Sequence, residues 1–368
     1  MTQLSLISAA TLLILLITLI PLLRTEVWWV RGLDFPRLQF ASFAFALLIV
    51  QQYCLSLTLS STWMLMAVTL GCLVYQLWWI LPYTRLYPVE VLAADADVVN
   101  SSEASINTLT ANLLTPNRNA RGFLALVQQY SPDIVVTLES DEWWEGQLDS
   151  LQDSYPYSLK CPQDNLYGMH VYSRLPLLDA TIEYLVEDDV PSMHADVELP
   201  SGQRIRAHFL HPAPPSPTEN EESTERDAEL IMVAKSLEGC RRPTIVTGDL
   251  NDVAWSDTTR LFRKISGLLD PRVGRGMFNT YHADHWFVRW PLDHLFHSDH
   301  FTVRELKRLP YFGSDHFALY ASLQLQGKAL DEQDPIQADE DDEAWADEKL
   351  AELNVDESDV PVPGQQAL

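Results

Sequence analysis

Short apolar segments of this sequence end repeatedly at a carboxylate, an amide or an imidazole. The side chains at these ends are Asn112, Glu139, His211, Asp249, Asn251, Asp293, Asp315 and His316. In α/β proteins, active sites gather in the loops that follow the ends of strands. If the strands share one sheet edge, these side chains converge on a single pocket of carboxylates, amides and two histidines.

A pocket of this composition has a specific chemical use. A hard divalent cation takes oxygen ligands, and Mg²⁺ commonly binds one or two carboxylates together with a substrate phosphate. Hydrolysis of a phosphate ester needs an oriented water molecule and an offset for the charge that develops on phosphorus. A His–Asp pair supplies a general base, because the carboxylate fixes the tautomer and stabilises the imidazolium. These residue types predict Mg²⁺-dependent cleavage of a phosphate ester, with Mn²⁺ as the alternative ion.

Apolar strand-like runs alternate with amphipathic runs between these side chains. The strand-like runs are 105–113, 134–138, 169–173, 204–210, 244–247, 292–297 and 317–325. Residues 120–130 and 226–237 have apolar residues at helical spacing. Short apolar strands interspersed with helices indicate an α/β protein whose sheet layers are covered by helices.

The first 85 residues contain three long uncharged runs, at 4–23, 39–60 and 61–83. About 20 apolar residues cross a hydrocarbon core of about 30 Å as a helix. The sequence therefore predicts three transmembrane helices over residues 1–85, with the lipid bilayer as partner. A cleaved signal peptide and a buried hairpin of a soluble protein are the alternatives. The absence of a basic segment before the first run, and the two runs that follow it, disfavour the signal peptide.

The side of the membrane on which the main domain lies is left open. Three spans put Met1 and the main domain on opposite sides. Arg24, Arg31, Arg37 and Arg85 are the basic residues of this region, and all four lie on the side of the main domain. The sequence thus predicts a multi-pass protein of the cell (inner) membrane. The positive-inside rule places its main domain on the cytoplasmic side.

The C-terminal segment is strongly acidic. A linker at 86–103 joins the spans to a main domain at 104–326, and a tail follows at 327–368. Residues 329–368 hold 14 acidic residues and one basic residue, Lys349. Blocks of like charge repel and seldom pack. We expect a solvated, disordered tail, with a short helix over 344–353 and the binding of an unidentified protein partner as alternatives.

The net charge of the chain limits its partners. The sequence has 25 Lys and Arg against 51 Asp and Glu, which gives a formal charge of −26. Binding of long nucleic acid through charge needs a surplus of basic residues that face the phosphates. The composition therefore disfavours nucleic acid and favours a small or lipid-linked phosphate ester as the substrate.

Seven short motifs carry a resemblance to a known family. In chain order they are TLTAN, PDIVVTLES, YGMHVYSRLPL, HPAPP, GDLND, PLDH and GSDH, within about residues 104–325. GDLN and SDH are short motifs, and the specificity comes from the order of all seven. The set resembles the endonuclease/exonuclease/phosphatase superfamily. That resemblance implies a four-layer α/β sandwich, with two packed mixed β-sheets flanked by helices, and Mg²⁺-dependent phosphoester cleavage.

The resemblance also implies roles for the metal-side residues. Glu139 matches the family's metal-ligating glutamate, Asn112 matches the asparagine beside the metal site, and Asp315 matches a residue near the metal. Asp249 and Asn251 match the pair that positions the nucleophile and contacts the scissile phosphate.

The remaining matches concern proton transfer. His316 matches the general base, with Asp293 as its orienting carboxylate, and His211 matches the histidine that binds phosphate or assists the leaving group. One position departs from the pattern: Leu114 stands where repair nucleases usually carry an aspartate, which weakens a repair-nuclease function.

Each residue taken singly also has an ordinary structural interpretation. Glu139 could cap a helix that begins near Asp141, Asp249 could be a turn residue after Gly248, and His316 could be a buried core histidine. The occurrence of the whole set in order favours the functional interpretation.

Three functions follow from these observations. The first is a membrane-anchored phosphoesterase acting on a lipid-linked or small phosphate ester, the second a membrane-tethered endo- or exonuclease, and the third a non-catalytic scaffold. The first resembles bacterial membrane-anchored members of the superfamily, including ones linked to glycopeptide resistance, which join three N-terminal spans to this domain. Those members are thought to face outward, opposite to what the arginine count indicates. The third is disfavoured because every expected site position holds a competent residue.

Overall fold

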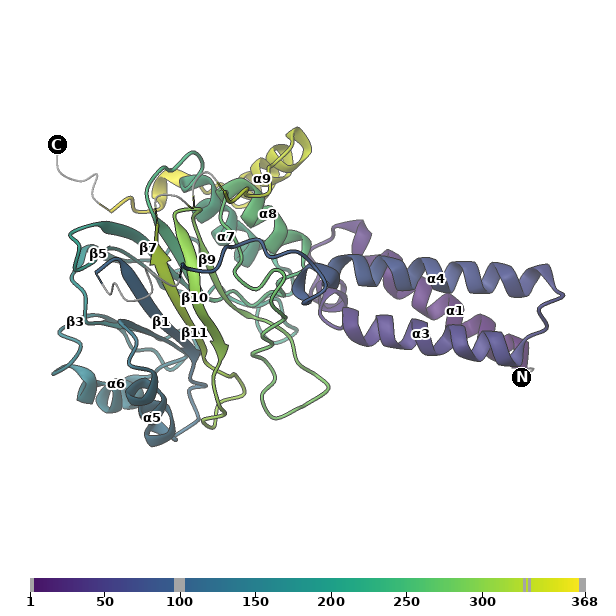
Figure 1. Ribbon diagram of the computed structural model, residues 1–368, viewed down its shortest axis with the longest axis horizontal. Coiled ribbons are helices and arrows are strands. Elements are labelled where there is room, and N and C mark those ends of the chain that lie inside the picture. Colours follow the sequence, from purple (N-terminus) through teal and green to yellow (C-terminus); the bar gives the residue numbers. More distant parts are fainter. Residues whose placement is uncertain (1–2, 96–102, 327–328, 330–331, 364–368) are drawn as a thin grey trace.

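The computed structural model describes residues 3–95, 103–326, 329 and 332–363. Two packed β-sheets flanked by helices form the main domain, and a bundle of long helices from the N-terminal region extends from one side of it (Figure 1). The predicted α/β sandwich is confirmed.

The first sheet has six strands in the order β10-β11-β1-β2-β4-β3. Their bounds are Phe301–Arg308, Leu319–Leu325, Ser105–Asn112, Ile134–Leu138, Met169–Ser173 and Tyr157–Cys161 in that order. Only β1 and β2 are parallel neighbours, and the other pairs are antiparallel.

The second sheet has five strands in the order β5-β6-β7-β8-β9. Their bounds are Leu177–Glu183, Ser192–Glu198, Arg204–Leu210, Thr244–Asp249 and Asp293–His297. Here β7 and β8 are the parallel pair.

One parallel crossover in each sheet positions the polar strand ends. Helix α5 (Ala120–Tyr130) connects β1 to β2, and α7 (Thr224–Ser236) connects β7 to β8. Parallel strands end at the same sheet edge, so the residues after these four strands meet between the two sheets. A hydrogen bond of 2.8 Å between the hydroxyls of Thr110 and Thr247 joins the sheets just below that edge.

The apolar side chains follow this layering. The sandwich core is built from the inward faces of both sheets, for example Val136, Val171, Ala207 and Phe209. A second cluster packs α7 and α8 (Asp257–Ser266) on the outer face of the five-stranded sheet. A third packs α5 and α6 (Glu142–Leu148) on the outer face of the six-stranded sheet.

The N-terminal region contains two helical segments that are long and apolar enough to cross a membrane, Gln3–Leu23 and Ser60–Tyr83. They consist of α1 (Gln3–Leu19) with a 3-10 turn, and α4 (Ser60–Ile80) with another. A third span results if α2 (Trp28–Arg31), its 3-10 extension and α3 (Arg37–Cys54), which meet at a bend of 67°, are taken together. Two of the three predicted runs thus have the length and composition of a span, and the middle one, predicted at 39–60, has them only as part of the bent pair.

The base of the helix bundle is attached to the main domain by hydrogen bonds. The indole N–H of Trp255 donates to the Asp34 carbonyl at 2.9 Å, and the Tyr83 hydroxyl donates to the Ala254 carbonyl at 2.5 Å. Trp255 is 2% exposed, so this attachment is buried.

The acidic C-terminal segment differs from the expected disordered tail. It contains α9 (Glu340–Leu353), which begins at a capping box between Asp339 and Asp342 and packs against α7 and α8. The Lys349 ammonium is buried and pairs with Asp227 at 2.6 Å and with Glu26 at 2.5 Å. The helix folds because its apolar face and its one lysine meet complementary partners, although most of its other side chains repel one another.

Candidate active site

The ends of β1 and β2 bring an amide and a carboxylate together. The Asn112 side-chain N–H donates to Glu139 Oε1 at 2.6 Å and to Asp249 Oδ2 at 3.2 Å. Glu139 has a left-handed backbone, with φ of 53°. Asp141, and not Glu139, caps helix α6, because its side chain accepts from the Trp144 N–H at 2.9 Å. The carboxylate of Glu139 is thus free to face the site.

Asp249 ends β8 in a tightly packed turn. Its Oδ1 accepts a hydrogen bond of 3.0 Å from the backbone N–H of Asn251. Gly248 lies against the neighbouring strand so closely that an added Cβ would come within 1.8 Å of the Leu210 carbonyl oxygen. Glycine is therefore required before Asp249 by this close approach of two backbones.

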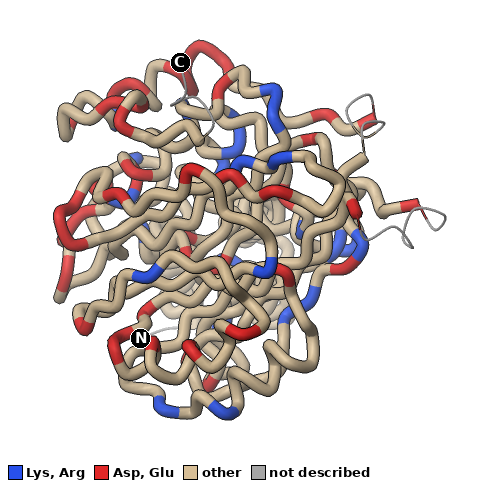
Figure 2. The backbone as a smooth tube through the Cα atoms, turned by 90° about the vertical axis from the view of Figure 1, so that its left-hand side faces the viewer, with Lys and Arg blue, Asp and Glu red and all other residues tan. Residues whose placement is uncertain are grey.

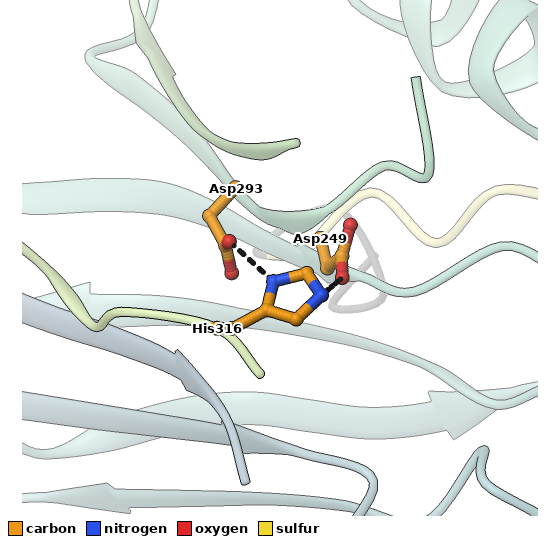
Figure 3. A group of neighbouring side chains, drawn as sticks. All are labelled: Asp249, Asp293 and His316. Carbon is orange, nitrogen blue, oxygen red and sulfur yellow. Dashed lines mark hydrogen bonds and ion pairs between the residues drawn. The ribbon is translucent and has the colours of Figure 1, made fainter. Parts of the chain in front are cut away.

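His316 lies between two carboxylates that come from β8 and β9 (Figure 3). Its Nδ1 is 2.8 Å from Asp293 Oδ2, and its Nε2 is 3.5 Å from Asp249 Oδ2. All three side chains are buried. A ring held at one nitrogen by a carboxylate has a fixed orientation, which leaves the other nitrogen for proton transfer.

The pKa values of these groups depart from their ordinary range for identifiable reasons. Burial lowers the pKa of His316, but Asp293 and Asp249 outweigh it and raise the value to about 10. Burial raises the pKa of Glu139 to about 7, against the lowering effect of the Asn112 hydrogen bond. Burial lowers the pKa of His211 to about 4. Such shifts cluster at functional sites, where charged groups are desolvated together.

The remaining sequence-predicted residues lie around this centre. Asn251 uses one side-chain N–H to donate to the Pro212 carbonyl at 3.0 Å. His211, after β7, is fully enclosed, and its ring stands 5.7 Å from that of Tyr167. Asp315 lies next to His316 and shares a cavity with Glu139. The structure thus brings all eight predicted side chains to the same end of the sandwich.

A cavity of about 520 Å³ opens over these residues. Its walls include Glu139, Asn251, Asp315 and His316 from the predicted set. Tyr281 also lines it, with its ring 4.8 Å from that of His316, and sequence reasoning did not identify this tyrosine.

The oxygen atoms of this site suit a hard divalent cation. Glu139 Oε2 is buried and has no hydrogen-bond partner among the residues that the structure describes. An orphaned buried carboxylate oxygen beside an amide is the arrangement that a bound Mg²⁺ would complete. Asp249, Asp293 and His316 also offer ligand atoms within 4.8 Å of one another. Those atoms already face each other, so a cation there would have to displace the bond between His316 and Asp293.

Among the residues that the structure describes, no lysine or arginine lines the cavity. Arg118 pairs with Asp141 at 2.8 Å, Arg174 stacks over Tyr155, and Arg275 donates to backbone carbonyls. None of these three lines the cavity. The face of the molecule turned away from the helix bundle shows acidic positions around much of its outline, with basic ones scattered among them (Figure 2).

Known proteins give a consistent picture of the fold. The sequence matches the endonuclease/exonuclease/phosphatase family over residues 109–316. No curated protein sequence matches it. Among solved structures, the human nocturnin catalytic domain with bound sulfate has a TM-score of 0.51 at 16% identity, covering 67% of this chain and 99% of that one.

Two further solved structures are similar at lower scores. Humanized D. rerio TDP2 has a TM-score of 0.49 at 16% identity, covering 60% of this chain and 99% of that one. Sphingomyelinase C from Streptomyces griseocarneus has a TM-score of 0.44 at 16% identity, covering 59% and 99%. At such identities the likeness concerns the fold alone.

Proposed function

Because the chain belongs to the endonuclease/exonuclease/phosphatase family, whose members hydrolyse phosphate esters, we propose that it is a membrane-anchored, Mg²⁺-dependent phosphoesterase acting on a lipid-linked phosphate ester. The observation that carries the proposal is the convergence of Asn112, Glu139, Asp249, Asp293 and His316 from separate strand ends on one cluster, of which Glu139 and His316 line the cavity. The apolar N-terminal helices, whose base is attached beside that cavity, support a substrate within the bilayer.

In this proposal Glu139 holds the cation, with Asn112 and Asp315 beside it, and Mn²⁺ can replace Mg²⁺. A bound divalent ion would polarise a phosphoryl oxygen and offset the charge that develops on phosphorus. Asn112 contributes by orienting the Glu139 carboxylate through its 2.6 Å hydrogen bond. Asn251 and His211 provide uncharged N–H donors for the other phosphoryl oxygens.

Asp249 and His316 together accept the proton of the attacking water. Asp249 is fixed by the Asn251 N–H and its Oδ2 lies 3.5 Å from His316 Nε2, so a water that contacts both atoms would be oriented for attack. Asp293 stabilises the imidazolium form of His316. Because the two carboxylates favour the protonated ring, we assign proton acceptance to the pair, and not to His316 alone as the sequence suggested.

The test uses the purified full-length protein in detergent or nanodiscs. Phosphate release from polyprenyl phosphate and phospholipid substrates is measured beside nicking of a supercoiled plasmid, with Mg²⁺ and with EDTA. We expect Mg²⁺-dependent release from a lipid phosphate, its loss in Asp249→Asn, and its retention in the exposed matched control Asp347→Asn. Plasmid nicking without lipid hydrolysis would favour the nuclease, and no activity on either substrate would favour the scaffold.

A further inference from the structure

The catalytic cavity has one wall that belongs to the membrane-attached part of the chain. Trp28, Gly32 and Phe35 line it together with Trp290 and Leu292. We call these five residues the juxtamembrane slot. The same cavity is lined at its polar end by Glu139, Asn251 and His316, so phosphate chemistry and an apolar surface share one continuous space.

The slot is held rigidly against the main domain. The Trp28 backbone N–H donates to the Glu221 carbonyl at 2.9 Å. Phe35 meets Trp290 edge to face, with ring centroids 5.5 Å apart. These contacts, with the Trp255–Asp34 hydrogen bond, place the wall without help from a ligand. A preformed apolar wall costs little to order when a chain binds to it.

The slot also lies where the apolar helices meet the main domain. Trp28 follows the first span, Gln3–Leu23, and Phe35 comes just before α3. Trp28 remains 39% exposed and Trp29 50% exposed, as expected for indoles at the level of lipid headgroups. A lipid whose phosphate reached Glu139 would therefore run its first carbons past the slot toward the bilayer.

We propose that the juxtamembrane slot binds the hydrocarbon chain of the substrate next to its phosphate, and thereby selects long-chain phosphate esters over short-chain ones. This inference rests on the proposed function for its choice of phosphate. Each methylene buried in such a slot strengthens binding by about fourfold. The occupant is a linear or prenyl chain, and a nucleotide base stacked on the same indoles is the outcome that would contradict the proposal.

Gly32 offers a direct way to fill the slot. Its φ of −58° is an ordinary helical value, and an added Cβ would meet no atom within 4 Å. Gly32→Leu therefore adds apolar atoms beside the cavity without backbone strain. Gly71 in α4 is equally open, so Gly71→Leu is a matched control within the helix bundle. Trp28→Ala tests the same wall by removing surface.

The measurement is binding of octyl phosphonate and ethyl phosphonate, whose C–P bonds resist hydrolysis, to the full-length protein in nanodiscs with Mg²⁺. We expect octyl phosphonate to bind at least tenfold more tightly to the wild type and to Gly71→Leu. Gly32→Leu and Trp28→Ala should each reduce this ratio at least fivefold.

The proposal for the slot would be contradicted if Gly32→Leu and the wild type had the same ratio of octyl phosphonate affinity to ethyl phosphonate affinity. Tighter binding of adenosine monophosphate than of octyl phosphonate would also contradict it. Binding that depends on the length of the hydrocarbon chain, without hydrolysis of any phosphate ester, would contradict the proposed function but support the slot. Hydrolysis of a phosphate ester without such a dependence would support the proposed function but contradict the slot.

Discussion

Two groups of buried histidines, one at the strand ends and one on the outer face of the five-stranded sheet, have opposite electrostatic environments. At the strand ends, His316 lies between Asp249 and Asp293, and its pKa is raised to about 10. On the outer face of β6 and β7, burial and then Arg206 lower the pKa of His194 to about 3. Burial alone therefore does not determine the protonation state of a histidine, because the charge of its neighbours decides whether it holds a proton.

The outer group is a neutral, structural network. His194 Nδ1 and His208 Nδ1 are 2.6 Å apart, and the Arg206 Nε–H donates to His208 at 2.7 Å. Arg206 also donates to the carbonyl of Pro361 in the C-terminal segment. This cluster ties the sheet to the segment that covers it, and the charged group that acts on His194 is the cationic Arg206. We therefore expect the two groups to respond differently to mutation.

The largest effect is expected at the strand ends. His316→Gln and Asp249→Asn should each lower kcat/KM for a phosphate ester about 10³-fold, because each removes part of the proton-accepting pair. Steady-state hydrolysis with saturating Mg²⁺ measures this. His194→Gln on the outer face should stay within about twofold of the wild type. A loss in His194→Gln as large as that in His316→Gln would remove the distinction between the two groups.

A smaller effect is expected at the metal side. Glu139→Gln keeps the shape of the side chain but removes the charge that would hold the cation. The Mg²⁺ concentration for half-maximal activity should rise at least tenfold, with a smaller change in the rate at saturating Mg²⁺. A Mg²⁺ titration of activity checks this, and an unaltered titration midpoint would exclude Glu139 as a ligand.

The smallest effect concerns stability and pH at the outer face. An unfolded histidine titrates near 6.5, whereas folded His194 titrates near 3. Between these values the unfolded state binds more protons, so the folded state loses stability as the pH falls below about 6.5. His194→Gln removes this group. When the pH is lowered from 7 to 5.5, the free energy of unfolding of this variant should therefore fall by about 1 kcal/mol less than that of the wild type. Denaturant unfolding of the full-length protein at both pH values measures the difference, and identical losses would contradict the assignment.

The sequence identified the strand-end residues because chemistry and order act together there. His211, for example, follows β7 directly, whereas His208 alternates to the outer face, and the period-two pattern of a strand separates them. Strands β3, β5, β6 and β10 were not predicted, because polar residues break up their apolar runs. In β6, Ser192, His194 and Asp196 are all buried under neighbouring elements that no local pattern reveals.

Two features depended on tertiary contacts, although a short helix over 344–353 was an alternative for the first of them. The acidic segment folds as α9 because Lys349 meets Asp227 and Glu26, residues more than 100 positions away. Trp28 and Phe35 were interpreted only as part of the membrane region, and their place in the catalytic cavity follows from how that region docks. Long-range packing therefore determines the wall of the site, while local patterns determine its polar end.

The most direct test of the account is the position of a bound divalent ion. Crystals or oriented samples of the full-length protein prepared with Mn²⁺ would show the ion by its anomalous scattering. We predict a single Mn²⁺ bound by Glu139, with Asn112 and Asp315 beside it, and the bond between His316 and Asp293 intact. An ion held by Asp249, Asp293 and His316 instead, or no ion near Glu139 at millimolar Mn²⁺, would contradict the proposed catalytic arrangement.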